Sequence, residues 1–118
     1  MESILTSVKD DLGIAEEYTH FDSQIIRHIN SVFMILNQIG VGPPEGFYIE
    51  DELTTWTEFI ENVGELELVK SYMFLRVRLL FDPPLGGTVM ESMNNQIREF
   101  EFRLNVAADR YGGIQNGV

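Results

Sequence analysis

The chain has 118 residues, a length typical of one domain, and its 19 acidic and eight basic residues give a formal net charge of −11. This negative charge argues against binding to nucleic-acid phosphates, which requires clustered Lys and Arg. Cysteine is absent, which excludes disulfides and thiolate chemistry. We also expect no signal peptide, because acids lie beside the apolar residues of the N-terminus and no long h-region is present. We expect no membrane span, because no apolar run approaches ~18 residues.

The acidic excess lies in the first half of the chain. Residues 1–65 carry 13 acids and two bases, whereas residues 66–118 carry six of each. The simpler interpretation is a solvated, solubilising surface. The alternative is a surface lining a passage through which DNA slides without sticking.

The first predicted elements are two helices. Ser3 can cap a short first helix that stops at Gly13. Asp22 is the predicted N-cap of a second helix, which runs to about Ile39 and is ended by Gly40. The apolar residues of each segment recur at helical spacing.

Residues 40–54 predict a long loop, because they contain three glycines and two prolines followed by acids. Long irregular loops are more often functional than connective. Thr55 and Glu58 then fit a capping box for a short helix. Asn62 and Glu65 fit the same pattern at the start of the next helix.

The stretch from Leu66 to Pro84 predicts a central helix that two prolines end. Its first apolar stripe consists of Leu66, Val69, Met73, Val77 and Leu80. A second stripe on the roughly opposite side consists of Leu68, Tyr72, Leu75 and Leu79. A helix that is apolar on two sides must be covered on two sides, either by its own chain or by another copy.

Thr88 predicts a third capping box, which opens a last helix that runs to about Asp109. Phe102 and Val106 form an i, i+4 pair on this helix that points away from its core stripe. Residues 110–118 have three glycines and no periodicity, which predicts a flexible C-terminal tail. The expected fold is therefore all-α, a bundle of about four to five helices with one long loop, forming one domain over residues 1–109.

Catalytic and metal-binding patterns are sparse. His20 and His28 do not have the spacing of a standard metal pair. Glu50, Asp51 and Glu52 form a run rather than two carboxylates in different environments. Since nucleotide and nucleophile motifs are also missing, we expect no cofactor, no metal and no enzyme activity.

Binding features are more prominent: the second stripe of the central helix, the Phe102/Val106 pair, the acidic loop and the tail. Together they favour a protein whose burial is completed by a partner, although the second stripe has a simpler interpretation as packing under the first and third helices. The predicted subunit or partner interface consists of Pro43, Phe47, Tyr48, Glu50, Asp51, Leu68, Leu79, Phe102, Val106, Arg110 and Tyr111.

Four segments carry a resemblance to a known family: HINSVFMILNQIGVGP from His28, TTWTEFI around Trp56, VKSYMFLRVRLLFDPP from Val69, and IREFEFRLNVAAD. With them, most of residues 1–109 resembles the phage head–tail connector family, the small head-completion or adaptor proteins that dock beneath the portal. The shared pattern is one of packing rather than of catalysis.

The resemblance implies an all-helical bundle that assembles with itself into a ring, expected to be a dodecamer in the virion. It implies contact with the portal protein on one side and with a tail-side stopper or tail protein on the other. DNA would pass through the ring without specific binding. The expected location is the virion, and the host cytoplasm during assembly.

Two other functions stay open at this point. An acidic helical protein-binding module, such as a DNA-mimic regulator without a virion role, would need acids along one exposed face at phosphate-like spacing. The acids of this chain are instead clumped at 10–17 and 45–52. An enzyme of unknown type is the third hypothesis, and the missing catalytic motifs argue against it.

Overall fold

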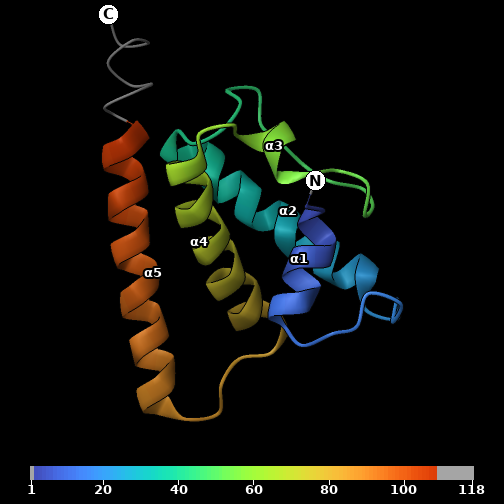
Figure 1. Ribbon diagram of the computed structural model, residues 1–118. Coiled ribbons are helices and arrows are strands. Elements are labelled where there is room, and N and C mark those ends of the chain that lie inside the picture. Colours follow the sequence, from blue (N-terminus) through green and yellow to red (C-terminus); the bar gives the residue numbers. More distant parts are fainter. Residues whose placement is uncertain (1, 109–118) are drawn as a thin grey trace, which may run out of the picture.

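The computed structural model describes residues 2–108, which form five helices and no strand (Figure 1). The helices are α1 (Ile4–Asp11), α2 (Asp22–Ile39), α3 (Trp56–Phe59), α4 (Val63–Phe81) and α5 (Gly87–Ala108). The all-α bundle expected from the sequence is thus confirmed. None of these helices is long and apolar enough to cross a bilayer.

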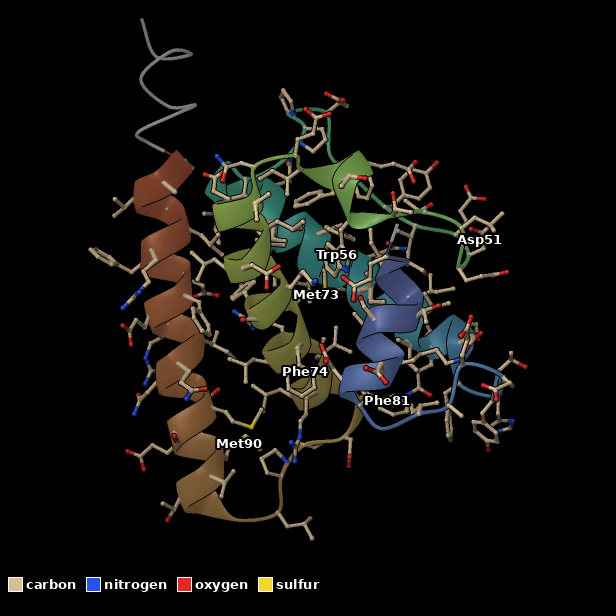
Figure 2. All side chains as sticks on the ribbon, in the orientation of Figure 1. Asp51, Trp56, Met73, Phe74, Phe81 and Met90 are labelled. Atoms are coloured by element: carbon tan, nitrogen blue, oxygen red, sulfur yellow. The ribbon has the colours of Figure 1, made fainter. Side chains whose placement is uncertain are left out.

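The central helix is α4, which contacts α5, α2 and α1 (Figure 1). Val69, Met73 and Val77 of its first stripe are fully buried, and Figure 2 shows Met73 toward the middle of the bundle. From the second stripe, Tyr72 is fully buried and its hydroxyl reaches Glu101 of α5. Both apolar sides of α4 are therefore covered largely by the chain itself.

Most helix ends follow the predicted local chemistry. The Ser3 hydroxyl accepts a hydrogen bond from the first turn of α1 at 3.2 Å, and the Asn62 side chain accepts one from the first turn of α4 at 3.0 Å. The capping box at Thr55 is formed. Gly13 and Gly40, which follow α1 and α2, have φ angles of +78° and +98°, a left-handed conformation that glycine adopts without steric cost.

The connector between α1 and α2 closes around the ammonium group of Lys9, whose exposed fraction is 2%. Nζ donates to the carbonyl oxygens of Glu16 at 2.9 Å and Tyr18 at 2.8 Å, and it lies 2.8 Å from Oδ1 of Asp22. A buried charge requires such pairing. The prediction that Asp22 caps α2 is wrong: Phe21 holds the N-cap position, and the Asp22 carboxylate pairs with Lys9.

The predicted cap of the last helix is also wrong. The helix α5 begins at Gly87, so Thr88 lies within its first turn, and the amide of Met90 already donates to the carbonyl of Gly86 at 3.0 Å. The predicted tail, residues 110–118, lies outside the described residues.

We expect Val77→Asp to abolish cooperative folding, or to lower the free energy of unfolding by more than about 4 kcal/mol, because an unpaired carboxylate would be buried. Circular dichroism with denaturant unfolding measures this. The matched control is Val63→Asp in the first turn of the same helix, where Val63 is 72% exposed and the helix dipole favours a negative charge. Equal losses in the two variants would contradict the assignment of α4 as the buried centre.

Candidate functional site

The helix α5 lies at one edge of the bundle, with α4 between it and α1 (Figure 1). Its buried residues are Met93, Ile97 and Leu104. On the other side, Phe102 is 69% exposed and Val106 is 48% exposed. The pair predicted to point away from the core is therefore open to solvent, and its part in an interface remains a prediction.

Two arginines flank this apolar pair. Arg103 forms an ion pair with Glu99 at 2.7 Å, in which both side chains are well exposed. Arg98, one turn before Phe102, donates to Asn95 on the same helix and forms no ion pair within residues 2–108. We call Arg98, Phe102, Arg103 and Val106 the α5 outer face, an apolar pair beside one arginine that is paired with Glu99 and one that forms no ion pair among the described residues.

A polar cluster joins α5 to α4. The hydroxyl of Tyr72 donates to Oε2 of Glu101 at 2.7 Å, and Nε of Arg76 donates to that hydroxyl at 3.1 Å while its guanidinium also contacts Glu101. Burial first, and then the bond to Glu101, raises the pKa of Tyr72 to about 12. Burial acts to raise the pKa of Glu101, but the hydrogen bonds from Tyr72 and Arg76 outweigh it and lower that pKa below its usual value.

Two asparagines of α2 hold the loop that follows it. The side chain of Asn30 donates to the carbonyl of Ile49 at 2.9 Å and accepts from its amide at 2.8 Å. Seven residues later, on the same side of the helix, Asn37 donates to the carbonyls of Pro43 and Pro44 at 3.3 Å. The loop is thus fixed at both ends of the segment 43–49.

This anchoring distributes the predicted loop residues between core and solvent. Phe47 is half-buried and packs edge-on against Phe33 and Phe59, with ring centroids 5.1 Å and 5.2 Å apart. Tyr48, the next residue, is 66% exposed, and Glu50 is also exposed.

The end of this loop lies far from α5. Asp51 is half-buried, and its carboxylate accepts the amide of Leu53 at 2.9 Å. Figure 2 shows Asp51 on the opposite side of the molecule from α5. The end of the loop at Asp51 and α5 therefore lie on opposite sides of the molecule (Figure 2), whereas the start of the loop at Pro43 lies beside the end of α5.

A hollow of about 330 Å³ opens between α2 and the loop. Its lining residues are Asn30, Phe33, Met34, Asn37, Glu45, Gly46, Phe47 and Tyr48. The floor is aromatic, Met34 and Tyr48 are exposed at the rim, and Glu45 is the one charged side chain of the lining. We call this depression the α2–loop hollow.

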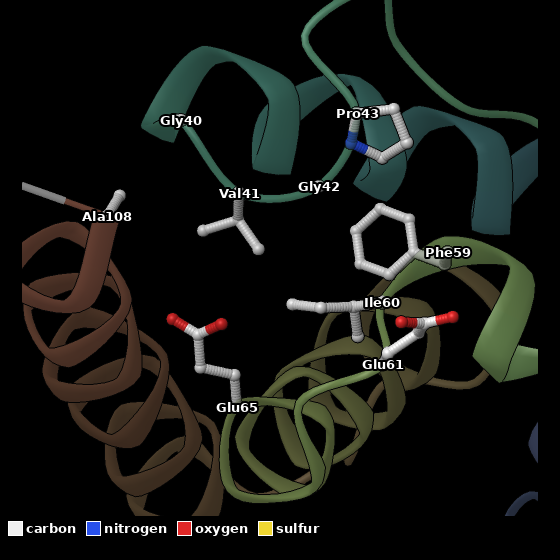
Figure 3. Close-up of a pocket in the computed structure, with 9 residues that line it drawn as sticks. All are labelled: Gly40, Val41, Gly42, Pro43, Phe59, Ile60, Glu61, Glu65 and Ala108. Atoms are coloured by element: carbon white, nitrogen blue, oxygen red, sulfur yellow. The ribbon is translucent and has the colours of Figure 1, made fainter. Parts of the chain in front are cut away.

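A second hollow, of about 410 Å³, lies where α2, the α3–α4 junction and the end of α5 meet (Figure 3). Pro43 lines it, together with Val41 and Ile60, and the carboxylates of Glu61 and Glu65 lie at its edge. Pro43 is thus part of this hollow rather than of the exposed part of the loop.

A glycine shapes this second hollow. Gly42 has a φ of +89°, and a Cβ atom there would lie 2.3 Å from the ring of Phe59. The close approach of the backbone to this ring therefore requires glycine.

The remaining predicted interface residues are less accessible or lie outside the structure. Leu68 and Leu79 are half-buried and pack against the core. Arg110 and Tyr111 lie outside the described residues. The sequence prediction did not include Asn30, and the signal available was two asparagines at i, i+7 beside the apolar stripe of α2.

No group of three or more His, Asp or Glu side chains within residues 2–108 could hold a metal ion. Burial, and secondarily the charge of Arg27, lowers the pKa of His28, which keeps its imidazole neutral at pH 7. The features that stand out are the exposed apolar pair of α5 and the two hollows beside the loop.

A family model described as phage connector protein matches residues 4–111 of the chain. No curated protein sequence and no solved structure matches it. The match covers more than nine-tenths of the chain, including every helix of the bundle.

We expect Asn30→Ala to lower the free energy of unfolding by about 2 kcal/mol, because the amide and carbonyl of buried Ile49 would both lose their partner. Urea unfolding measures this loss. Asn37→Ala on the same helix is the control and should cost less, since its two bonds are longer and partly exposed. A larger loss for Asn37→Ala would contradict the assignment of Asn30 as the main anchor of the loop.

We expect Glu101→Gln to cost about 1 kcal/mol at pH 7, an estimate that allows for the partial exposure of the cluster. Because the pKa of Glu101 is lowered on folding, its stabilising contribution is complete above pH 4.5 and is lost as the pH falls further. The gap between parent and variant in urea unfolding should therefore shrink below pH 4.5. Glu99→Gln, which removes only an exposed pair, should show little gap at any pH, and a gap that widens on acidification would refute the account.

Proposed function

The chain belongs to the phage connector protein family, and on that basis we propose that it docks on the portal protein and assembles as a ring around the DNA channel. The family gives it a structural connector role that involves other phage head or tail proteins. The ring, its dodecameric size, the portal contact and the contact with a tail-side stopper or tail protein are the proposal. The protein would reach the virion after assembly in the host cytoplasm.

The observation that carries the ring is the exposure of Phe102. Its phenyl side chain is 69% exposed, although the helix that carries it is well anchored to α4. A neighbouring copy can bury this exposed apolar area. Val106 extends this area by one turn. A ring also needs a second, different patch on each copy, and we assign that patch to the acidic loop.

The charge distribution supports a channel role. Ten of the 13 acids in residues 1–65 are exposed, whereas the bases of that half are only Lys9, which is buried, and Arg27. Lining a channel with such a surface repels DNA phosphates, so DNA passes without being held. Arg110 and Tyr111 belong to the segment that we assign to contact with the portal or the tail-side protein.

The test is native mass spectrometry of the purified protein, alone and mixed with its portal protein. A ring of defined stoichiometry on the portal is the expected result. A strict monomer in both samples would overturn the proposal. Capture of a basic nucleic-acid-binding host protein in place of virion proteins would favour the DNA-mimic function instead.

We expect Phe102→Ala to leave the fold intact, with a change in unfolding free energy within about 0.5 kcal/mol, and to weaken ring formation on the portal. Phe100→Ala is the paired variant two residues away: Phe100 packs against the core, so its truncation should cost about 3 kcal/mol. Leu85→Ala, at a fully exposed position, should affect neither property. A loss of several kcal/mol in Phe102→Ala would place Phe102 in the core and remove the basis for the ring contact.

A further inference from the structure

We infer that Phe102 of one copy inserts into the α2–loop hollow of the next copy, so that the two surfaces form one head-to-tail contact. This inference rests on the proposed ring and names the residues that would close it. Both halves of the contact lie on the same chain, on different elements. The occupant that the inference commits to is therefore a second copy of this protein.

The hollow offers the chemistry that a phenyl ring requires. Phe33 and Phe47 line it and already pack edge-to-face, with centroids 5.1 Å apart, above Phe59 at 4.7 Å from Phe33. A further ring entering between Met34 and Tyr48 would extend this aromatic arrangement and gain a sulfur–aromatic contact. The volume of about 330 Å³ accommodates a phenyl group with part of Val106 beside it.

Charge favours the same pairing. Arg98 lies one turn from Phe102 and forms no ion pair within the described part of the chain, and Arg103 is the neighbour of Phe102. The charged residue of the hollow is Glu45, which is exposed and forms no ion pair within residues 2–108. Insertion of Phe102 would bring Arg98 of one copy toward Glu45 of the next, two opposite charges that each lack an ion pair within residues 2–108.

The two surfaces belong to different elements, as a head-to-tail contact requires: Phe102 lies on α5, whereas the hollow lies between α2 and the loop. A patch that meets a different patch on the next copy makes a heterologous contact, which generates a ring when the rotation closes. A symmetric dimer through α5 alone would leave the α2–loop hollow empty.

Thiol cross-linking tests the contact cleanly, because the chain has no cysteine of its own. One variant carries Asn105→Cys, next to Phe102 on α5, and another carries Gln38→Cys, one turn from Met34 on α2; both positions are exposed. When the two variants are mixed and treated with a short thiol–thiol linker, they should form a cross-linked heterodimer. Its yield should be well above that from a mixture of Asn105→Cys with a Leu85→Cys control. A yield equal to the control, or an equal yield of Asn105→Cys homodimer, would overturn the inference.

Two further arms identify the groups in contact. Adding Phe102→Ala to the Asn105→Cys variant should lower the heterodimer yield about tenfold, as truncation of a buried interface aromatic does. Arg98→Glu in the Asn105→Cys variant and Glu45→Arg in the Gln38→Cys variant should each lower the heterodimer yield. Combining the two substitutions in one mixture should restore that yield. An unchanged yield with Phe102→Ala, or no restoration in the charge swap, would refute the assigned pairing.

The same samples separate this inference from the ring itself. Native mass spectrometry with the portal protein reports ring formation independently of the linker. A ring on the portal without the Asn105–Gln38 cross-link would leave the proposed function standing and refute the contact. Absence of both would refute the proposed function as well.

Discussion

The bundle is built around α4, a helix with apolar side chains on two sides that contacts α5, α2 and α1. One side is buried through Val69, Met73 and Val77, and the cover comes from α2 and α1. The other side requires α5, which is joined through the Tyr72–Glu101 bond and the apolar residues around it. Because α5 has to cover α4, its own opposite face is left to solvent, and the exposed Phe102 is a direct result of this arrangement.

The parts of the fold that could be predicted from sequence are those set by neighbouring residues. The caps at Ser3 and Asn62 and the glycine stop at Gly40 are local interactions, so their residue types suffice to locate the helix ends. Helical spacing also identified Phe102 as pointing away from the core, and the structure confirms its exposure. The predicted and observed helix ends agree because each end is determined by residues that are close to it in the sequence.

The features that sequence could not predict depend on residues far apart in the chain. Asp22 is of a residue type that commonly caps helices, but its carboxylate pairs with the buried ammonium group of Lys9 instead. The hydrogen bonds of Asn30 to Ile49 span 19 residues, and that from Tyr72 to Glu101 spans 29. The α2–loop hollow forms where such bonds and the packing of Phe47 on Phe33 hold the loop against α2, so no pattern within one segment indicates it.

The double hydrogen bond of Asn30 to Ile49 has a consequence for how this protein meets its neighbours. Ordering a loop when two proteins associate consumes binding energy through lost conformational entropy. Here the segment carrying Tyr48 is already held when the subunit folds, so encounter with a neighbour begins from a preformed shape. In the proposed ring, a small contact area would then suffice for attachment, and association would not wait for a slow rearrangement of this loop.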